Sequence, residues 1–348
     1  MEYKYNPGFS DDQGLIDAFT VRQPNLALIV ETIRQNQGTA NQHVLVIGTR
    51  GMGKTMLVRR VAAEIRTDPT LAQQWYPLVF AEESYSITTP GEFWLQALFH
   101  LQDQTQAERW QKAYTYLRLE ANEMRLRQQA LAQLMDFADS QEQRILLVVE
   151  NLNMLFEEQL GSNDDWDLRH TLQNEPRVML LGTTTHRFQQ IDHVQKAWFE
   201  FFAIYELEAL SHEDCQRLWE AITGEPISTQ QIRPIRTLTG GNPRLLRVMA
   251  GFAIGKSFSE LMTNLSQLID EHTDYFKGQL DNLPATERKI FVALLQIWDP
   301  ASAREVATAA RISVSQTSVS LKRLMERGAV VEAGQVSRKK LYQVTERL

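Results

Sequence analysis

The first 210 residues alternate short apolar runs with stretches that place apolar side chains at helical spacing, as in residues 24–36. The apolar runs lack the polar alternation of a half-exposed strand, which is typical of strands buried on both faces. Because strands that alternate with helices form parallel sheets, we expect an α/β fold with a parallel sheet. The predicted strands are His43–Ile47, Tyr76–Ala81, Ile145–Val149 and Arg177–Gly182.

The pattern changes further along the chain. Residues 104–141 contain neither Gly nor Pro and are rich in Gln, Ala, Leu, Glu and Arg, which predicts one or two long helices. After Ser211 the strand pattern stops, and helical spacing continues with breaks at Gly224 and Gly240–Pro243. We therefore expect three parts: an α/β core over residues 1–210, a helical segment over 211–283 and a separate domain over 284–348.

The last 65 residues carry the pattern of a helix-turn-helix followed by a β-hairpin. Helices are predicted at Glu287–Leu295 and Ser302–Ala310, and residues 312–328 are predicted to form a short turn and a further helix that ends at Gly328. Strands are predicted at 329–332 and 341–344. On the third helix we expect Val319, Leu321 and Leu324 to face the core. The residues predicted to contact duplex DNA are Ser315, Gln316, Thr317, Ser318 and Lys322 in a groove, and Arg338, Lys339 and Lys340 on phosphates.

Charge and composition support a nucleic-acid-binding end on an acidic body. The formal net charge is −7, but eleven basic residues stand against six acidic ones from Pro284 onward, so this end carries +5 and the rest −12. Cys215 is the single cysteine, which excludes an intramolecular disulfide and favours a reducing cytoplasm. No apolar stretch is long enough for a membrane span, and the seven histidines show no metal spacing.

One motif predicts nucleotide binding. Gly48, Gly53, Lys54 and Thr55 fit G-x-x-x-x-G-K-[ST], with an apolar strand before the motif and an amphipathic helix after it. Lys54 is expected to reach the β- and γ-phosphates of ATP, and the Thr55 hydroxyl to bind Mg²⁺. The loop predicted to surround the phosphates consists of Gly48, Thr49, Arg50, Gly51, Met52, Gly53, Lys54, Thr55 and Met56.

A carboxylate at the end of a neighbouring strand completes such a site, and Glu150 is the candidate. Related layouts place two acidic residues here, whereas this chain has Glu150 followed by Asn151, so hydrolysis is expected to be slow. Two assignments remain open. Either Glu150 serves the metal while Asn151 orients water, or Glu150 is the general base and Thr55 is the main protein ligand of the metal.

With these residues the chain resembles the AAA+ superfamily, and within it the origin-recognition/initiator and signal-transducing (STAND-like) ATPases that join a P-loop core to a helical lid and a winged helix. The resemblance implies that Arg22 lies near the adenine and that Thr184 or Thr185 senses the γ-phosphate. It also implies that Arg244, in the lid motif Gly240–Leu246, reaches the γ-phosphate. The C-terminal domain resembles a MarR-type winged helix.

Such ATPases usually complete each site with an arginine from a neighbouring subunit, and Arg169 and Arg187 are the candidates. The leading hypothesis is an ATP- and Mg²⁺-dependent switch that assembles as a homo-oligomer on duplex DNA. One alternative is a nucleotide-gated signalling adaptor whose winged helix binds an effector protein. Another is a transcription regulator that has acquired an ATPase core.

Overall fold

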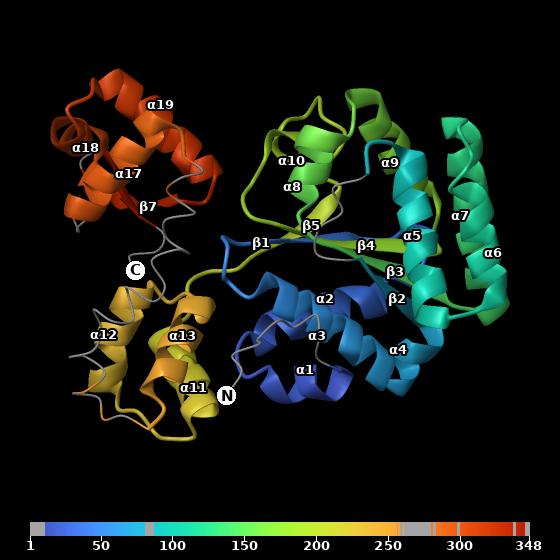
Figure 1. Ribbon diagram of the computed structural model, residues 1–348, viewed down its shortest axis with the longest axis horizontal. Helices are drawn as coiled ribbons and strands as arrows, with labels where there is room; N and C mark the ends of the chain where they lie inside the picture. Colours follow the sequence, from blue (N-terminus) through green and yellow to red (C-terminus); the bar gives the residue numbers. More distant parts are fainter. Residues whose placement is uncertain are drawn as a thin grey trace. The chain divides into compact units, whose positions relative to one another are not determined.

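The computed structural model describes residues 11–80, 87–255, 257, 260, 280, 283–297, 300–336 and 339–344. The chain forms two compact units (Figure 1). The first contains the chain as far as Leu207, apart from the loop Gly48–Gly53, and the second contains this loop and the chain from Glu208 onward. The predicted phosphate-binding motif is therefore divided, because its first six residues belong to the second unit and Lys54 and Thr55 to the first.

A five-stranded parallel sheet forms the centre of the first unit, as the apolar runs predicted. Its strand order is β2-β3-β4-β1-β5. The bounds are β1 (His43–Ile47), β2 (Trp75–Val79), β3 (Arg144–Val149), β4 (Val178–Thr184) and β5 (Phe202–Glu206). Every residue of β1 and β4 is buried. The sequence analysis did not predict β5, an edge strand beside β1 in which most residues are partly or fully exposed.

Helices cover both faces of this sheet (Figure 1). One face carries α1 (Asp12–Ala18), α2 (Gln23–Gln35), α3 (Lys54–Thr67) and α4 (Pro69–Gln74). The other carries α8 (Leu152–Met154), α9 (Ser162–Asn174) and α10 (Gln189–Asp192), with a π-helical turn at Leu155–Gln159 after α8. Close packing explains Gly182 within β4, since a Cβ atom there would lie 2.1 Å from the Leu152 Cδ1 atom.

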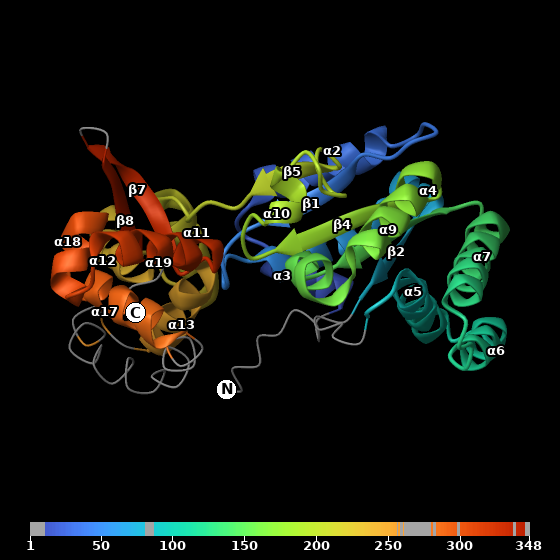
Figure 2. The ribbon, with the colours of Figure 1, turned by 90° about the horizontal axis from the view of Figure 1, so that it is seen from above.

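Residues 104–141 form the predicted long helices, α6 (Glu108–Leu117) and α7 (Glu123–Gln141), which pack against α5 (Pro90–Thr105) at one end of the first unit (Figure 2). The Glu123 carboxylate accepts hydrogen bonds from the Gly91 backbone N–H at 2.6 Å and the Thr89 hydroxyl at 2.7 Å. This carboxylate stabilises α5, because a negative charge is favourable beside a helix N-terminus.

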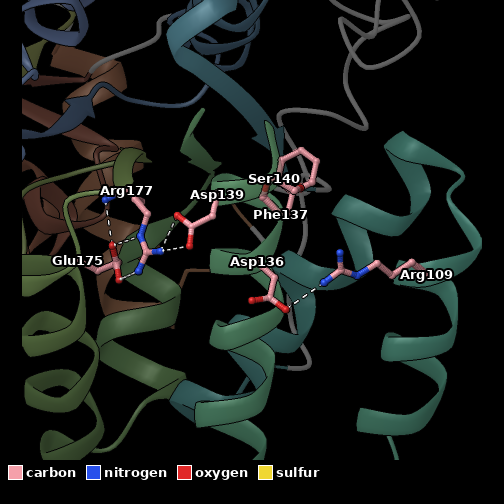
Figure 3. Close-up of polar contacts among 7 residues, drawn as sticks. All are labelled: Arg109, Asp136, Phe137, Asp139, Ser140, Glu175 and Arg177. Atoms are coloured by element: carbon pink, nitrogen blue, oxygen red, sulfur yellow. Dashed lines mark hydrogen bonds and ion pairs between the residues drawn. The ribbon is translucent and has the colours of Figure 1, made fainter. Parts of the chain in front are cut away.

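Ion pairs attach the end of α7 to the start of β4 (Figure 3). The Arg177 Nη1 atom lies 2.8 and 2.7 Å from the two Asp139 carboxylate oxygens, and its Nε atom lies 2.8 Å from Glu175 Oε1. The Nη2 atom also donates to Glu175 Oε2 at 2.8 Å, and this bidentate pair with Glu175 fixes the residue that precedes β4. Asp136 also pairs with Arg109 of α6 at 3.0 Å, but both side chains are more than half exposed, so this pair contributes little to stability.

Within the second unit, the chain after Glu208 begins with α11 (His212–Thr223), α12 (Thr229–Thr239) and α13 (Pro243–Ala253). A side chain caps the N-terminus of each helix: Ser211, Ser228 and Asn242 respectively. Gly224 and Gly240 end the first two helices in the left-handed conformation, so the breaks predicted at these glycines are helix ends. Residues between 256 and 282 lie outside the described part, except 257, 260 and 280.

The described residues from 283 onward form three helices and a small antiparallel sheet in the order β6-β8-β7. The elements are α17 (Ala285–Ile297), β6 (Ala301–Ser302), α18 (Ala303–Ala310), α19 (Val314–Glu326), β7 (Val330–Val336) and β8 (Lys339–Val344). They share an apolar core of their own. The buried Glu287 carboxylate pairs with Arg323 at 3.8 Å and with Arg327 at 3.3 Å, and thereby attaches α19 to α17.

Candidate nucleotide site

The loop Gly48–Gly53 follows β1 and forms a tight turn. Gly51 and Gly53 adopt φ values of +87° and +88°, which residues with a side chain rarely adopt. A backbone hydrogen bond of 3.3 Å from Met52 N to Thr49 O tightens the turn. The helix α3 begins at Lys54, directly after the loop, and a helix N-terminus favours negative charge. Such a backbone binds anions.

A hydroxyl and a carboxylate meet at the start of α3. The Thr55 hydroxyl donates a hydrogen bond to Glu150 Oε2, and Glu150 follows the last residue of β3, as the sequence predicted. Lys54 and Glu150 are both 8% exposed. Hydroxyl and carboxylate oxygens are the protein ligands that Mg²⁺ prefers, so the side chains here fit a magnesium ion bound together with phosphate. Bound Mg²⁺ would neutralise phosphate charge at this point.

Asn151 occupies the position where a second acidic residue was expected, and its backbone conformation gives a reason. Its φ and ψ of 57° and 44° lie in the left-handed region, which Asn adopts more readily than Glu does. Its backbone N–H donates a hydrogen bond of 3.3 Å to the Thr183 hydroxyl. The left-handed backbone therefore favours Asn at position 151, whatever part its side chain has in hydrolysis.

The three threonines that end β4 and follow it have different surroundings. Thr184 is fully buried, and its hydroxyl lies 3.0 Å from the Asn153 Oδ1 atom and 2.9 Å from the His186 carbonyl oxygen. The Thr185 hydroxyl lies 2.9 Å from the His186 Nδ1 atom.

Thr183 is the threonine whose hydroxyl meets the backbone beside Glu150, and the sequence reasoning had not named it. The pairing of Val149 with Gly182 was the missing information, because it places the next residues of the two strands side by side.

Arg244 lies in the first turn of α13, as predicted, and its backbone N–H lies 3.3 Å from the Gly51 carbonyl oxygen. Asn242, which the sequence reasoning did not single out, contacts the same loop through its side-chain amide. Arg22 precedes α2 in a left-handed conformation with φ of 69°. A role for Arg22 beside the adenine stays a prediction.

The two candidate arginines for a neighbouring site have different surroundings. Arg169 Nη1 donates hydrogen bonds to the Ala197 carbonyl and, at 3.1 Å, to the Phe199 carbonyl, and burial lowers the pKa of its guanidinium. Arg187 pairs with Asp192 at 2.7 Å and with Glu206 at 2.8 Å, and about half of its side chain is exposed. Arg169 therefore binds backbone carbonyl groups, whereas Arg187 pairs with carboxylates at the surface.

The polar residues of α19 only partly match the predicted DNA-contacting set. Ser315, Gln316, Ser318 and Lys322 are exposed. Thr317 is fully buried and Val319 is 52% exposed, so the predicted directions of these two side chains were wrong. The reason is helical spacing: Thr317, Ser320, Leu321 and Leu324 share one face, and the leucines fix that face in the core.

The predicted phosphate contacts of the hairpin are less completely described. Lys340 is exposed and pairs with Glu332 at 2.8 Å, which raises the pKa of its ammonium group. Arg338 lies outside the described residues. Lys339 is the first residue of β8.

The described residues contain neither a helix suited to a membrane nor a cluster of metal-binding side chains. None of their helices combines the length and the apolar character that crossing a membrane requires. Within the same residues, no group of three or more His, Cys, Asp or Glu side chains is placed to hold a metal ion.

Comparison with known proteins agrees with this geometry. Residues 18–181 match the family described as AAA ATPase domain. A Walker-type ATPase of Pyrococcus abyssi superimposes with a TM-score of 0.65 at 13% identity, over 94% of each chain. The ORC1 protein of Aeropyrum pernix, solved in complex with DNA, gives 0.53 at 13% identity, over 95% of this chain and 90% of that one. Comparison with curated proteins finds no match in sequence.

These structural similarities concern the fold alone, because the identities are low. The family match is a similarity in sequence, and the matched residues 18–181 contain the predicted phosphate-binding loop and Glu150. An AAA ATPase domain uses a nucleotide and usually Mg²⁺, in agreement with the side chains at the start of α3. Residues 18–181 are therefore similar in sequence to an AAA ATPase domain, and the fold agrees with this similarity.

Proposed function

We propose that this protein is an ATP-controlled switch that binds and slowly hydrolyses Mg²⁺-ATP and thereby controls its own assembly on duplex DNA. The observation that carries the nucleotide part is the pairing of Thr55 with Glu150 directly after a loop with two left-handed glycines. Lys54 would bind the β- and γ-phosphates, and Thr55 and Glu150 would hold Mg²⁺.

Slow hydrolysis follows from the residues around Glu150. Asn151 supplies no carboxylate, so Glu150 must serve the metal, act as the general base, or divide its two oxygens between these tasks. The Thr183 hydroxyl already accepts the Asn151 N–H. A site with one carboxylate suits a protein that holds ATP for long periods better than one that consumes it continuously.

The DNA-binding part rests on the C-terminal segment. Its helix order, with α18 and α19 followed by the β7–β8 hairpin, fits a winged helix-turn-helix in which α19 enters the major groove. Ser315, Gln316 and Lys322 are exposed on α19, and Arg323 is 63% exposed beside them. The similarity to a fold that was solved with DNA supports this part of the proposal.

Assembly through the nucleotide requires an arginine from a second copy, and we favour Arg187 over Arg169. Arg187 is exposed and would exchange its surface carboxylates for a phosphate, whereas Arg169 would have to release two backbone carbonyls. The Arg187→Ala variant should bind ATP normally but lose any acceleration of hydrolysis that assembly produces. Retention of that acceleration would exclude Arg187.

Salt-dependent DNA binding tests the proposal. The full-length protein should bind duplex DNA with an affinity that falls steeply as salt rises, because counterions are released from the phosphates. The Lys322→Ala variant should weaken binding and reduce the magnitude of the salt slope by about one. Lys112, an exposed lysine of α6 that pairs with Glu108, provides the control, and Lys112→Ala should bind DNA as the unmodified protein does.

A second candidate function, a signalling adaptor, is favoured by one observation. Val314 and Val319 on α19 are 48% and 52% exposed, and apolar side chains on an outer helix face suit a protein partner better than a DNA groove. Absence of DNA binding at low salt would favour the adaptor. Measurement of molecular size with and without ATP and DNA then tests the switch, since Lys54→Ala should fail to assemble.

A further inference from the structure

The side chain of Asn242, which precedes α13, forms hydrogen bonds both to its own helix and to the loop Gly48–Gly53. Asn242 is 2% exposed and caps α13, because its Oδ1 atom accepts hydrogen bonds from Arg244 N at 2.9 Å and Leu245 N at 3.3 Å. Its Nδ2 atom donates a hydrogen bond of 3.1 Å to the Arg50 carbonyl oxygen, 192 residues away in sequence. The oxygen of this amide group therefore caps α13, while its nitrogen binds the loop Gly48–Gly53.

The contact is close and involves consecutive peptide groups of the loop. A Cβ atom on Gly51 would lie 2.7 Å from Asn242 Oδ1 and 2.8 Å from Nδ2, so the amide occupies the space that any side chain at position 51 would need. The next carbonyl, that of Gly51, accepts from the Arg244 backbone N–H at 3.3 Å. Both carbonyls thus face the first turn of α13.

The geometry of the peptide bond gives this contact a consequence for phosphate binding. The Arg50 carbonyl and the Gly51 N–H belong to one planar trans peptide and point in opposite directions. When Asn242 holds the carbonyl, it directs the Gly51 N–H away from α13. Successive N–H groups on the inner side of such a loop bind phosphate oxygens.

We propose that Asn242 is a positioning residue that couples phosphate binding by the loop to the stability of α13, a proposal that rests on the nucleotide-binding function proposed above. The ligand is the polyphosphate of a nucleotide. A phosphate that accepts from the Gly51 N–H polarises the peptide and makes the Arg50 carbonyl a better acceptor for Asn242. By thermodynamic linkage, the free energy by which the nucleotide stabilises α13 equals the free energy by which α13 strengthens nucleotide binding.

Two variants of Asn242 separate this coupling from simple helix capping. Asn242→Ser keeps a good N-cap acceptor but is too short to reach the Arg50 carbonyl as well. Asn242→Asp keeps the cap and the shape of the side chain but replaces the donor with a carboxylate oxygen. The control is Asn122→Asp at the N-terminus of α7, where Asn122 accepts from Arg125 N at 3.0 Å and the substitution keeps the cap.

The experiment measures Mg²⁺-ATP affinity by calorimetry and amide hydrogen exchange of residues 242–246 with and without saturating ATP. Both Asn242 variants should bind ATP about tenfold more weakly, as expected for one lost hydrogen bond in a buried site. At saturating ATP they should lack the slower exchange that ATP produces at α13 in the unmodified protein. Asn122→Asp should show normal affinity and normal protection.

Each result decides the matter. If both Asn242 variants bind ATP normally and show the full protection of α13, the coupling is refuted while the proposed nucleotide function stands. If Asn242→Asp alone is impaired, the added charge explains the loss and the coupling is also refuted. If the unmodified protein binds no ATP, the proposed function and the coupling fail together. Should Asn242→Ser not fold, weaker ATP binding by Asn242→Asp that persists at high salt supports the coupling, and normal binding refutes it.

Discussion

Asp165 gives a prediction whose magnitude follows from the structure. This α9 carboxyl is 6% exposed, and its Oδ1 atom accepts a hydrogen bond of 3.1 Å from the Trp198 indole N–H. Burial raises its pKa from 3.8 to about 7, the indole N–H lowers it in part, and the neighbouring Asp164 raises it further. We expect Asp165→Asn to stabilise the protein at alkaline pH, because Asn keeps the acceptor for Trp198 without the buried charge.

The sign and size follow from proton linkage. The folded protein holds a proton on Asp165 between pH 3.8 and about 7, whereas the unfolded chain has released it, so this group lowers stability as pH rises through that window. Each unit of pKa difference corresponds to about 1.4 kcal/mol, which gives an upper limit of about 4 kcal/mol above pH 7 and about 2 kcal/mol at pH 5. The benefit of Asp165→Asn should therefore be larger at pH 8 than at pH 5 by up to about 3 kcal/mol.

Urea denaturation of both proteins at pH 5 and pH 8 measures this difference. Burial lowers the pKa values of His43 and His100 to about 4, so they also make stability depend on pH, but they are present in both proteins and their effects cancel. Asp136→Asn removes an exposed ion pair and should change stability by less than about 1 kcal/mol at either pH. A benefit of Asp165→Asn that is equal at the two pH values would refute the reasoning.

Three further substitutions test the site and the sheet. Glu150→Gln should keep Mg²⁺-ATP affinity within a few-fold but lower the hydrolysis rate by about a hundredfold or more, as phosphate release would show; unchanged hydrolysis would exclude Glu150 as the base. Asn151→Val should lower the free energy of unfolding by about 1–2 kcal/mol because of its left-handed backbone, whereas Asn151→Gly should not. Gly182→Ala should cost about 1–3 kcal/mol through its contact with Leu152, whereas the control Gly38→Ala, with open space around it, should be nearly neutral; equal effects would contradict the packing.

Local patterns predicted most of the sheet and the phosphate-binding loop. Four of the five strands are continuous apolar runs, and burial on both faces leaves such runs little alternative. The fifth, β5, was missed although Phe202–Tyr205 is also an apolar run. Lys54 and Thr55 were predicted from a motif and Glu150 from its position at a strand end. The contact between Thr55 and Glu150 is observed, whereas the roles of all three residues in nucleotide binding stay predictions.

The residues that were missed depend on contacts between distant parts of the chain. Thr183 required the register between β3 and β4, and Asn242 required a contact across 192 residues. The directions of Thr317 and Val319 on α19 were predictable in principle, because Leu321 and Leu324 lie four residues after Thr317 and Ser320 on one helix face. Side-chain polarity alone assigned Thr317 and Val319 to the wrong faces of the helix.

Calorimetric titration of the purified full-length protein with Mg²⁺-ATP tests the central claim most directly, with Lys54→Ala measured in parallel. We expect saturable binding of one ATP per chain by the unmodified protein, and binding that is much weaker or undetectable in Lys54→Ala because the β- and γ-phosphates lose their cation. Absence of ATP binding by the unmodified protein, or equal affinity in the two proteins, would contradict a nucleotide bound over residues 48–55.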